Sequence, residues 1–296
     1  MEKNIKHIEL IKQALKEEDS NIELISATNN LVYKVETTNQ GNVYAKFYLN
    51  KSSHIDNEMN LYDIVDNKFL KEVIYKSKEN NFTIFKELKG KTIDEFSFEQ
   101  LEENKEKIVD SLIDFFESIS KKKLNGYGLL DENLNGKYKD FKEFIFSRQG
   151  KTQEILKSDS FLGNIFTKIY DKYSNLIVAD NLLVPIDTNM KNVMITDEGK
   201  VKFIDPGELI SAPILMGYGD FVAHIYKTPL YDYLNERLNL SSDDEIRLRI
   251  YAIFSSLNVL AFLKSNGVDE LSNIIPYGNK YTFFELIKKH LETLGL

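Results

Sequence analysis

Three polar residues in the second half of the chain have the types and the order that phosphoryl transfer requires. Asp187 and Asn192 form an Asp-x4-Asn pattern, and Asp205 follows the apolar run Val201–Ile204. In kinase-type chemistry, one carboxylate orients and deprotonates the attacking hydroxyl group, while an asparagine and a second aspartate hold the Mg²⁺ ion that bridges the nucleotide phosphates. The sequence therefore predicts Asp187 as the catalytic base and Asn192 and Asp205 as magnesium ligands.

Short apolar runs surround these residues. Residues 182–186, 193–195 and 201–204 show little helical periodicity, and residues 196–200 (TDEGK) are typical of a tight turn. The pattern predicts a β-hairpin over residues 193–204. Such a hairpin would bring the two predicted magnesium ligands, which lie just before and just after it, side by side.

Spacing alone is weak evidence, because the same Asp-x4-Asn pattern recurs from Asp159 to Asn164. That copy lies in a segment typical of a helix N-terminus, and we assign it no role. For Asp187 and Asp205, the structural alternative is that they form a turn and end a strand.

Composition restricts the classes of function. The chain has 296 residues, 42% hydrophobic and 28% charged, which suits one large globular domain or two lobes. Its net charge of −8 disfavours general nucleic-acid binding and mildly favours a cationic ligand. The absence of cysteine excludes disulfides, thiolate catalysis and cysteine zinc sites, and the four histidines lack metal-ligand spacing. With no apolar signal core and no membrane-spanning run, we expect a cytoplasmic protein without a membrane partner.

The N-terminal part of the chain contains a lysine in an unusual setting. A helix is predicted over residues 4–17 and strands over residues 22–48, and Lys46 lies inside one apolar strand. A buried ammonium group needs an anionic partner, and Glu58 falls on the apolar face of a helix predicted over residues 52–66. We predict a Lys46–Glu58 ion pair that directs the lysine to the nucleotide phosphates; alternatively, both side chains extend into water.

A second strand pair follows, over residues 71–77 and 82–88, and the pattern beyond it is mainly helical. In a kinase of two lobes, such a strand leads into a hinge whose backbone binds the edge of adenine. We therefore predict nucleotide contacts near Lys86, Glu87 and Leu88.

The order of these features resembles the aminoglycoside phosphotransferase and choline kinase-like family, from about residue 22 to 230. The resemblance implies an α+β, two-lobed protein-kinase-like fold, with a small antiparallel-sheet N-lobe that carries one key helix and a larger, mainly helical C-lobe. It implies a nucleotide-binding lobe over residues 1–89 and a catalytic and substrate-binding lobe over residues 90–296. It also implies the roles given above for the predicted site residues.

Two further segments carry the resemblance. Gly126-Tyr127-Gly128, followed by the aromatic-rich residues 138–146, looks like the family's insert before the catalytic loop. Gly219-Asp220-Phe221 looks like its Gly-Asp motif, which implies that the Asp220 carboxylate supports the catalytic loop.

Two positions depart from the family pattern. The histidine that usually stands two residues before the catalytic aspartate is replaced by Pro185, and the phosphate-covering loop, residues 26–30 (SATNN), lacks glycine. The hydroxyl groups of Ser26 and Thr28, with neighbouring backbone N–H groups, could still contact phosphate oxygens. The alternative for this loop is an ordinary polar hairpin turn.

These observations predict a small-molecule kinase, a phosphotransferase with an alcohol group as acceptor. It would use Mg²⁺ and transfer the γ-phosphoryl group of ATP or GTP to a cationic or sugar-like molecule, with an aminoglycoside-type antibiotic as the leading candidate. One alternative is a kinase of a metabolic amino alcohol or sugar, such as choline. Another is a nucleotide-binding pseudokinase without catalysis; the two departures suggest it, and the presence of all three polar residues argues against it.

Overall fold

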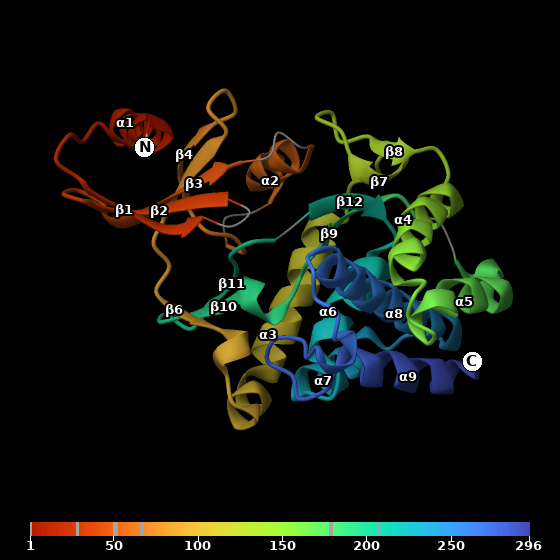
Figure 1. Cartoon of the computed structure of the whole chain (residues 1–296). Helices are drawn as coiled ribbons and strands as arrows, with labels where there is room; N and C mark the ends of the chain where they lie inside the picture. Colours follow the sequence, from red (N-terminus) through yellow and green to blue (C-terminus); the bar gives the residue numbers. More distant parts are fainter. Residues whose placement is uncertain (1, 28–29, 50–52, 66–67, 178–179, 207) are drawn as a thin grey trace.

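The chain folds into a small lobe built on one sheet and a larger lobe built mainly of helices (Figure 1). The structure, a computed structural model, describes residues 2–27, 30–49, 53–65, 68–177, 180–206 and 208–296. For residues 2–4, 53–58 and 208 it describes only the backbone. The predicted arrangement, an antiparallel N-terminal sheet followed by a mainly helical lobe, is confirmed.

The sheet of the small lobe is antiparallel throughout, with the strand order β1-β2-β3-β5-β4. The turn between β2 and β3 ends at Gly41, which has a φ of 72° that glycine adopts at no steric cost. The strands are β1 (Asn21–Ala27), β2 (Asn30–Thr37), β3 (Gly41–Tyr48), β4 (Val73–Ser77) and β5 (Phe82–Lys86).

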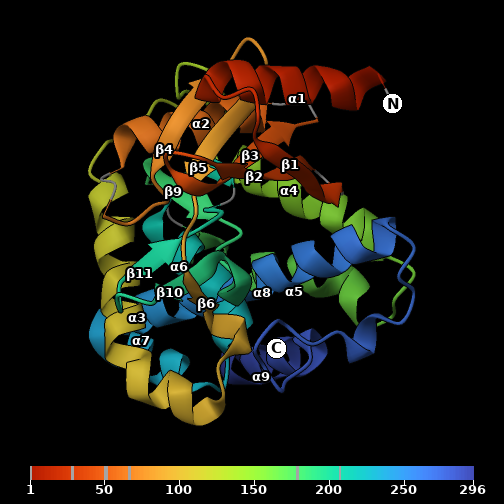
Figure 2. The same cartoon turned by 90° about the vertical axis from the view of Figure 1, so that its left-hand side faces the viewer.

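Alternation along β3 gives this sheet two different faces, because successive side chains of a strand point to opposite sides. Val43, Ala45 and Phe47 are buried on the outer face, where Ile11 of α1 (Glu2–Leu15) packs against them. Figure 2 shows α1 lying across this face. Lys46 therefore points to the other face, toward the larger lobe.

The helix α2 (Ser53–Ile64) lies between the sheet and the larger lobe. Leu61 and Tyr62 near its end are buried in the same cluster as Phe85 of β5 and much of the helical core. The two lobes therefore share one continuous hydrophobic core along this side, which fixes how the sheet stands over the helices.

Each helix of the larger lobe buries one apolar stripe. The long helix α3 begins at a capping box, in which Ser97 accepts from the Gln100 N–H and the Gln100 side chain accepts from the Ser97 N–H. The α-helices are α3 (Phe98–Ile119), α4 (Phe141–Leu156), α5 (Ile165–Tyr173), α6 (Ile214–Ile225), α7 (Pro229–Leu238), α8 (Ser242–Ser265) and α9 (Phe283–Leu294), and the 3₁₀ helices are η1 (Ile93–Glu95), η2 (Leu162–Asn164), η3 (Ser174–Leu176), η4 (Met190–Asn192) and η5 (Leu271–Asn273).

Two small sheets cover the top of these helices, below the N-terminal lobe. One has the order β11-β10-β6 and contains the predicted hairpin; the other has the order β8-β7-β12-β9. Residues 196–200 form the turn of the hairpin, closed by a hydrogen bond from the Thr196 N–H to the Lys200 carbonyl at 2.9 Å. The strands are β6 (Gly90–Thr92), β7 (Tyr127–Leu130), β8 (Gly136–Tyr138), β9 (Leu182–Ile186), β10 (Val193–Thr196), β11 (Val201–Phe203) and β12 (Glu208–Ala212).

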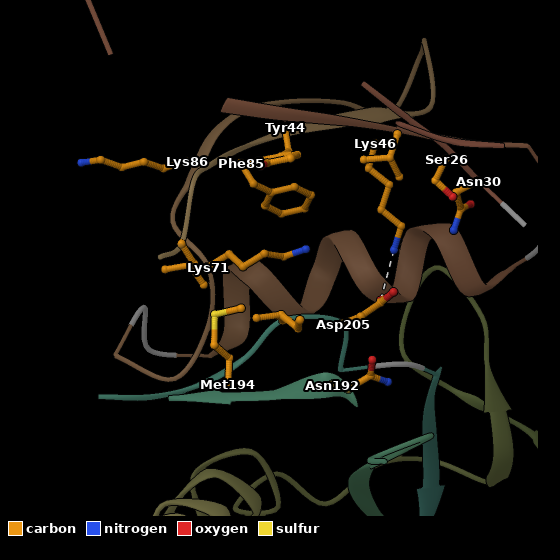
Figure 3. Close-up of a pocket in the computed structure, with 13 residues that line it drawn as sticks. Ser26, Asn30, Tyr44, Lys46, Lys71, Phe85, Lys86, Asn192, Met194 and Asp205 are labelled. Carbon is orange, nitrogen blue, oxygen red and sulfur yellow. Dashed lines mark hydrogen bonds and ion pairs between the residues drawn. The ribbon is translucent and has the colours of Figure 1, made fainter. Parts of the chain in front are cut away.

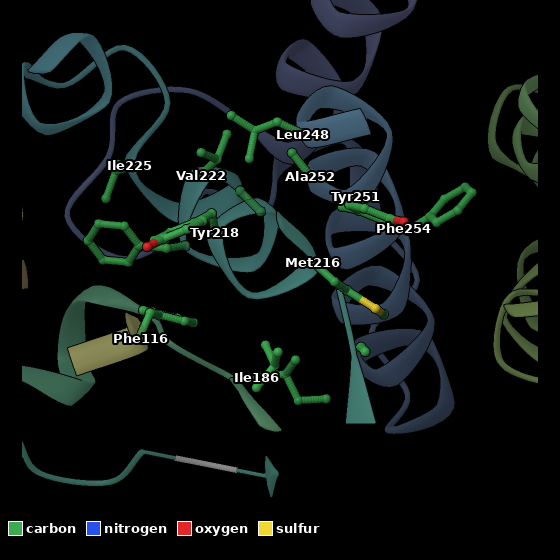
Figure 4. Close-up of a cluster of buried hydrophobic side chains, with 14 of the residues drawn as sticks. Phe116, Ile186, Met216, Tyr218, Val222, Ile225, Leu248, Tyr251, Ala252 and Phe254 are labelled. Atoms are coloured by element: carbon green, nitrogen blue, oxygen red, sulfur yellow. The ribbon is translucent and has the colours of Figure 1, made fainter. Parts of the chain in front are cut away.

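Helices α6 and α8 pack against each other, and Figure 4 shows buried side chains of α6, such as Val222, beside those of α8, such as Leu248 and Ala252. Among the described residues, α8 alone has the length and the apolar composition that could cross a membrane, but more than half of that stretch is buried inside the protein. It packs against α4, α6 and α9, as the core helix of a globular protein does.

Close approach of α6 to α8 depends on Gly219. A Cβ atom at this position would lie 2.6 Å from the Cβ of Tyr251 and 2.9 Å from the backbone nitrogen of Ala252. By contrast, a Cβ atom at Gly150 in the middle of α4 would have no neighbour within 4 Å. The two glycines therefore have opposite consequences for packing.

We expect Gly219→Ala to lower the free energy of unfolding by about 1–3 kcal/mol, because the two helices must separate. Gly150→Ala, its matched control, should raise it by up to about 1 kcal/mol, because alanine favours the helix without meeting a neighbour. Urea unfolding of both variants and the wild type measures the two effects. A Gly219→Ala protein as stable as Gly150→Ala would contradict this account of the packing.

Candidate active site

The predicted catalytic loop connects β9 to η4. Asp187 follows the last residue of β9 and has a φ of 73°, in the left-handed region that aspartate and asparagine tolerate better than most residues. Its side chain is exposed, and its Oδ1 atom accepts a hydrogen bond from the Asn189 side-chain amide at 2.9 Å. Asn189 in turn caps η4 by accepting from the Lys191 N–H at 3.0 Å. The Asp187 carboxylate is thus held by its own loop and open to solvent.

Asp220 of α6 holds this loop from below. Its Oδ2 atom accepts a hydrogen bond from the Thr188 N–H at 2.8 Å, and its Oδ1 atom accepts one from the Ser255 hydroxyl of α8. One turn further along α6, burial lowers the pKa of His224, an effect that the nearby Asp220 carboxylate partly opposes. The loop therefore rests on a carboxylate anchored in the helical core.

The hairpin places Asn192 and Asp205 next to each other. Val193 of β10 is paired with Phe203 of β11, and the Ile204 N–H donates to the Asn192 carbonyl at 2.9 Å. The Asn192 side-chain amide donates to the Asp187 carbonyl at 2.9 Å. The structure thus joins the catalytic loop and the hairpin end through short local hydrogen bonds.

Lys46 meets Asp205 across the two lobes. Its Nζ atom lies 3.1 Å from the Asp205 Oδ1 atom; the lysine side chain is 8% exposed and the aspartate side chain 48%. The lysine is therefore buried with an anionic partner, as burial of an ammonium group requires. The predicted ion pair with Glu58 stays a prediction, because the Glu58 side chain lies outside the described residues.

A cavity of about 440 Å³ lies between the sheet and the hairpin (Figure 3). Polar groups gather at one end, around Lys46 and Asp205, while the other end is lined mainly by apolar and aromatic side chains. Asp187 is not part of its lining. The lining residues are Ser26, Asn30, Val32, Tyr44, Lys46, Lys71, Phe85, Lys86, Leu88, Asn192, Met194, Ile204 and Asp205.

The three predicted hinge residues lie where β5 ends. Lys86 and Leu88 line the cavity, whereas Glu87 lines a neighbouring hollow and its carboxylate accepts from the Asn42 side-chain amide at 3.0 Å. The Tyr44 hydroxyl also donates to Glu87, and burial, followed by this carboxylate, raises the pKa of Tyr44. The Glu87 side chain thus braces the hinge and does not face the cavity.

The phosphate-covering loop is described only in part. Ser26 at the end of β1 lines the polar end of the cavity, whereas Thr28 lies outside the described residues. Asn30, the last residue of the predicted loop and the first of β2, also lines this end, although no contact of its own was predicted for it from the sequence. The sequence did offer a signal for Asn30, because it belongs to the segment predicted to cover the phosphates and its side-chain amide can donate hydrogen bonds.

Most of the residues that line the other end of the cavity were not predicted from the sequence. Tyr44 and Phe85 are a directly paired couple of β3 and β5, so they share the face that also carries Lys46. That face could have been deduced from the strand period once the register was known. Met194 of β10 and Ile204 close the cavity from the other lobe, and nothing in the local sequence separates them from core residues.

A metal ion here would need ligands from outside the protein. Within the described residues, no group of three His, Cys, Asp or Glu side chains could hold one alone. Asn192 and Asp205 offer two neighbouring oxygen ligands, which suits Mg²⁺, an ion that commonly takes one or two protein ligands and completes its shell with phosphates and water. The donor set therefore fits a magnesium–nucleotide complex.

Pro185 occupies the position of the family histidine without disturbing the loop. It is buried in β9, which is an edge strand, and it is paired with Leu209 of β12. Proline lacks an N–H group and is tolerated on edge strands for that reason. The backbone of the loop is fixed by Asp220 instead.

Comparison with known proteins finds solved structures with a similar fold. No protein-family model and no curated protein matches this sequence. Among solved structures, aminoglycoside phosphotransferase APH(4)-Ia matches with a TM-score of 0.69 at 12% identity, over 98% of this chain and 96% of that chain. Choline kinase LicA from Streptococcus pneumoniae matches with a TM-score of 0.65 at 17% identity, over 100% and 99%. A protein named as a putative fructosamine-3-kinase, from Haemophilus somnus, matches with a TM-score of 0.59 at 12% identity, over 97% and 95%.

Some of these similar structures contain ligands. Variants of the aminoglycoside phosphotransferase have been solved with hygromycin B and either ADP or AMP-PNP, and LicA has been solved with AMP. At these identities the likeness establishes the fold, and it confirms the resemblance predicted from the order of the motifs. The chain has the two-lobed protein-kinase-like fold that these small-molecule kinases share.

Proposed function

We propose that this protein is a small-molecule kinase that transfers the γ-phosphoryl group of ATP or GTP to a hydroxyl group. The acceptor is a cationic or sugar-like molecule in the cytoplasm, and an aminoglycoside is the leading candidate, which would give a role in antibiotic resistance. The likeness to aminoglycoside, choline and fructosamine kinases supports phosphoryl transfer to a small molecule. Their different acceptors leave a metabolic amino alcohol or sugar as the second candidate.

The contact between Lys46 and Asp205 carries this proposal. The two residues are 159 positions apart, yet their charged atoms lie 3.1 Å apart at the polar end of the cavity, beside Asn192. A core lysine paired only for stability would not need a half-exposed partner that opens into a cavity. The arrangement fits a lysine that binds phosphate oxygens and an aspartate that binds the metal on the same phosphates.

The remaining residues have distinct tasks in this mechanism. Bound magnesium would neutralise developing charge on the phosphates, with Asn192 and Asp205 as its protein ligands. Asp187 is exposed at the loop beside these ligands, where it accepts the proton of the acceptor hydroxyl and aligns that hydroxyl with the phosphorus. Asn189 and Asp220 position Asp187 through the contacts described above.

The hinge has backbone groups that could bind the base of the nucleotide. Within the described part of the chain, neither the N–H nor the carbonyl of Leu88 takes part in a backbone hydrogen bond, and Leu88 lines the cavity. A purine between the sheet and the pair Met194 and Ile204 could use these groups. Ser26 lines the polar end of the cavity, where its hydroxyl group would contact the phosphates. The phosphate contact of Thr28 stays a prediction from the sequence.

We expect Asp187→Asn to reduce kcat by about a hundred- to ten-thousand-fold, because the amide cannot accept the hydroxyl proton. Asparagine tolerates the left-handed backbone at this position, so the unfolding midpoint should stay near that of the wild type. Coupled detection of nucleoside diphosphate, with a panel of aminoglycosides, amino alcohols and amino sugars, measures kcat and identifies the acceptor.

Asp159→Asn is the matched control for this variant. Asp159 begins the second Asp-x4-Asn copy, and its carboxylate accepts from the Phe161 and Leu162 N–H groups, both at 2.9 Å, which an asparagine oxygen can still do. Its kcat should equal that of the wild type. Equal turnover of wild type and Asp187→Asn would remove Asp187 from the mechanism.

We expect Asp205→Asn to abolish the part of nucleotide binding that depends on magnesium. In the wild type, a nucleotide with Mg²⁺ at a hundred times its Kd should stabilise the fold by about 2.7 kcal/mol, or roughly 5 °C in Tm. The same nucleotide with EDTA should give a smaller shift, and in Asp205→Asn the two shifts should be equal. A wild type without any magnesium dependence would favour the pseudokinase alternative over an active kinase.

A further inference from the structure

Two buried serines are neighbours on α8, and their hydroxyl groups have different partners. Ser256 is fully buried and donates to the Ala252 carbonyl, one turn earlier in its own helix, at 2.8 Å. Such a bond to the preceding turn is common for a serine inside a helix. Ser255, which is 8% exposed, instead donates to the Oδ1 atom of Asp220 on α6. The single hydroxyl proton of Ser255 is therefore used for a contact between helices.

The Asp220 carboxylate joins Ser255 to the catalytic loop. Its Oδ2 atom accepts from the Thr188 N–H at 2.8 Å, and Thr188 directly follows Asp187 in the chain. Within the described residues, this carboxylate accepts from the Ser255 hydroxyl and the Thr188 N–H and from no third donor. The hydroxyl group on one oxygen thus limits rotation of the carboxylate, while the other oxygen holds the loop backbone next to Asp187.

Close packing of the two helices brings the short serine side chain within reach of Asp220. Tyr251 and Ser255 lie four residues apart on α8, so they share one face of that helix. On α6, Gly219 precedes Asp220, and a Cβ atom at Gly219 would lie 2.6 Å from the Tyr251 Cβ atom. The approach that requires glycine at position 219 therefore also brings the Ser255 hydroxyl to the carboxylate.

We infer that Ser255 is a positioning residue for the catalytic loop. Its hydroxyl group orients the Asp220 carboxylate, which in turn fixes the backbone that carries Asp187. The effect on turnover rests on the proposed function, whereas the chain of hydrogen bonds can be tested without a substrate. Ser255 is not part of the cavity lining, so its removal changes the rate of transfer and not the binding of the nucleotide.

Ser255→Ala and its matched control, Ser256→Ala, each remove one buried hydroxyl group from the same helix. Ser255→Ala leaves one carboxylate oxygen without its donor, and kcat should fall by about ten- to a hundred-fold, because a small displacement of a positioned group can cost that much in rate. The KM values for nucleotide and acceptor should stay near those of the wild type. Ser256→Ala should keep the wild-type kcat, because it changes a bond within one helix only.

Hydrogen exchange of the Thr188 N–H, followed by NMR, tests the same chain of contacts without turnover. Because loss of the Ser255 donor loosens the Asp220 carboxylate, this N–H should exchange about ten times faster in Ser255→Ala than in Ser256→Ala. Ser255→Thr keeps the hydroxyl group and should restore both the slow exchange and most of kcat. Unfolding midpoints show whether each variant folds.

The outcomes separate the inference from the proposed function. A folded Ser255→Ala with the kcat and the Thr188 exchange rate of Ser256→Ala refutes the positioning role, and so does a folded Ser255→Thr that is as impaired as Ser255→Ala. If Ser255→Ala does not fold, Ser255→Cys, with nearly the same shape and a weaker donor, takes its place in the comparison. A wild type without turnover on any acceptor refutes the proposed function, and the exchange rates then decide the role of Ser255 alone.

Discussion

One ion pair, between Lys46 and Asp205, joins the two lobes of this protein at the cavity. Lys46 is almost completely buried, so its ammonium group needs an anion, and Asp205 supplies that anion from the other lobe at 3.1 Å. One partner belongs to the sheet and the other to the end of a hairpin, so the pair links the two lobes beside the hydrophobic core that they share. The same pair defines the polar end of the cavity, which is where the proposed function puts the phosphates.

The large helices contribute to the site by holding loops rather than by lining the cavity. Asp187 lies on a loop, and the backbone of that loop is bound by Asp220 within a helix pair that packs closely through Gly219. Reactive side chains on loops over a rigid scaffold are a common arrangement, because the loop can present them to solvent while the scaffold limits their movement. This also explains how the chain tolerates Pro185, since the fixing contact comes from α6.

The cavity is asymmetric, and its two ends suit the two parts of a nucleotide. Charged and amide groups around Lys46 and Asp205 match phosphates and a metal ion, while aromatic and aliphatic groups around Phe85 and Met194 match the faces of a base. Lys71 and Lys86 add positive charge to the lining of the cavity. Asp187 lies outside this lining, so in the proposed function the acceptor would meet Asp187 beside the nucleotide cavity and not within it.

The sequence by itself determined the elements whose signals are local. The alternation around Lys46, the turn at residues 196–200 and the short strands on both sides of Asp187 depend on near neighbours, so they could be predicted, and with them the hairpin that joins Asn192 to Asp205. Only the tertiary structure decided that Asp205 would meet Lys46, that Lys71 would lie over Phe85, and that Asn30 would face the cavity. These contacts join residues far apart in the chain, and such contacts leave no periodic pattern, because they depend on how the whole core packs.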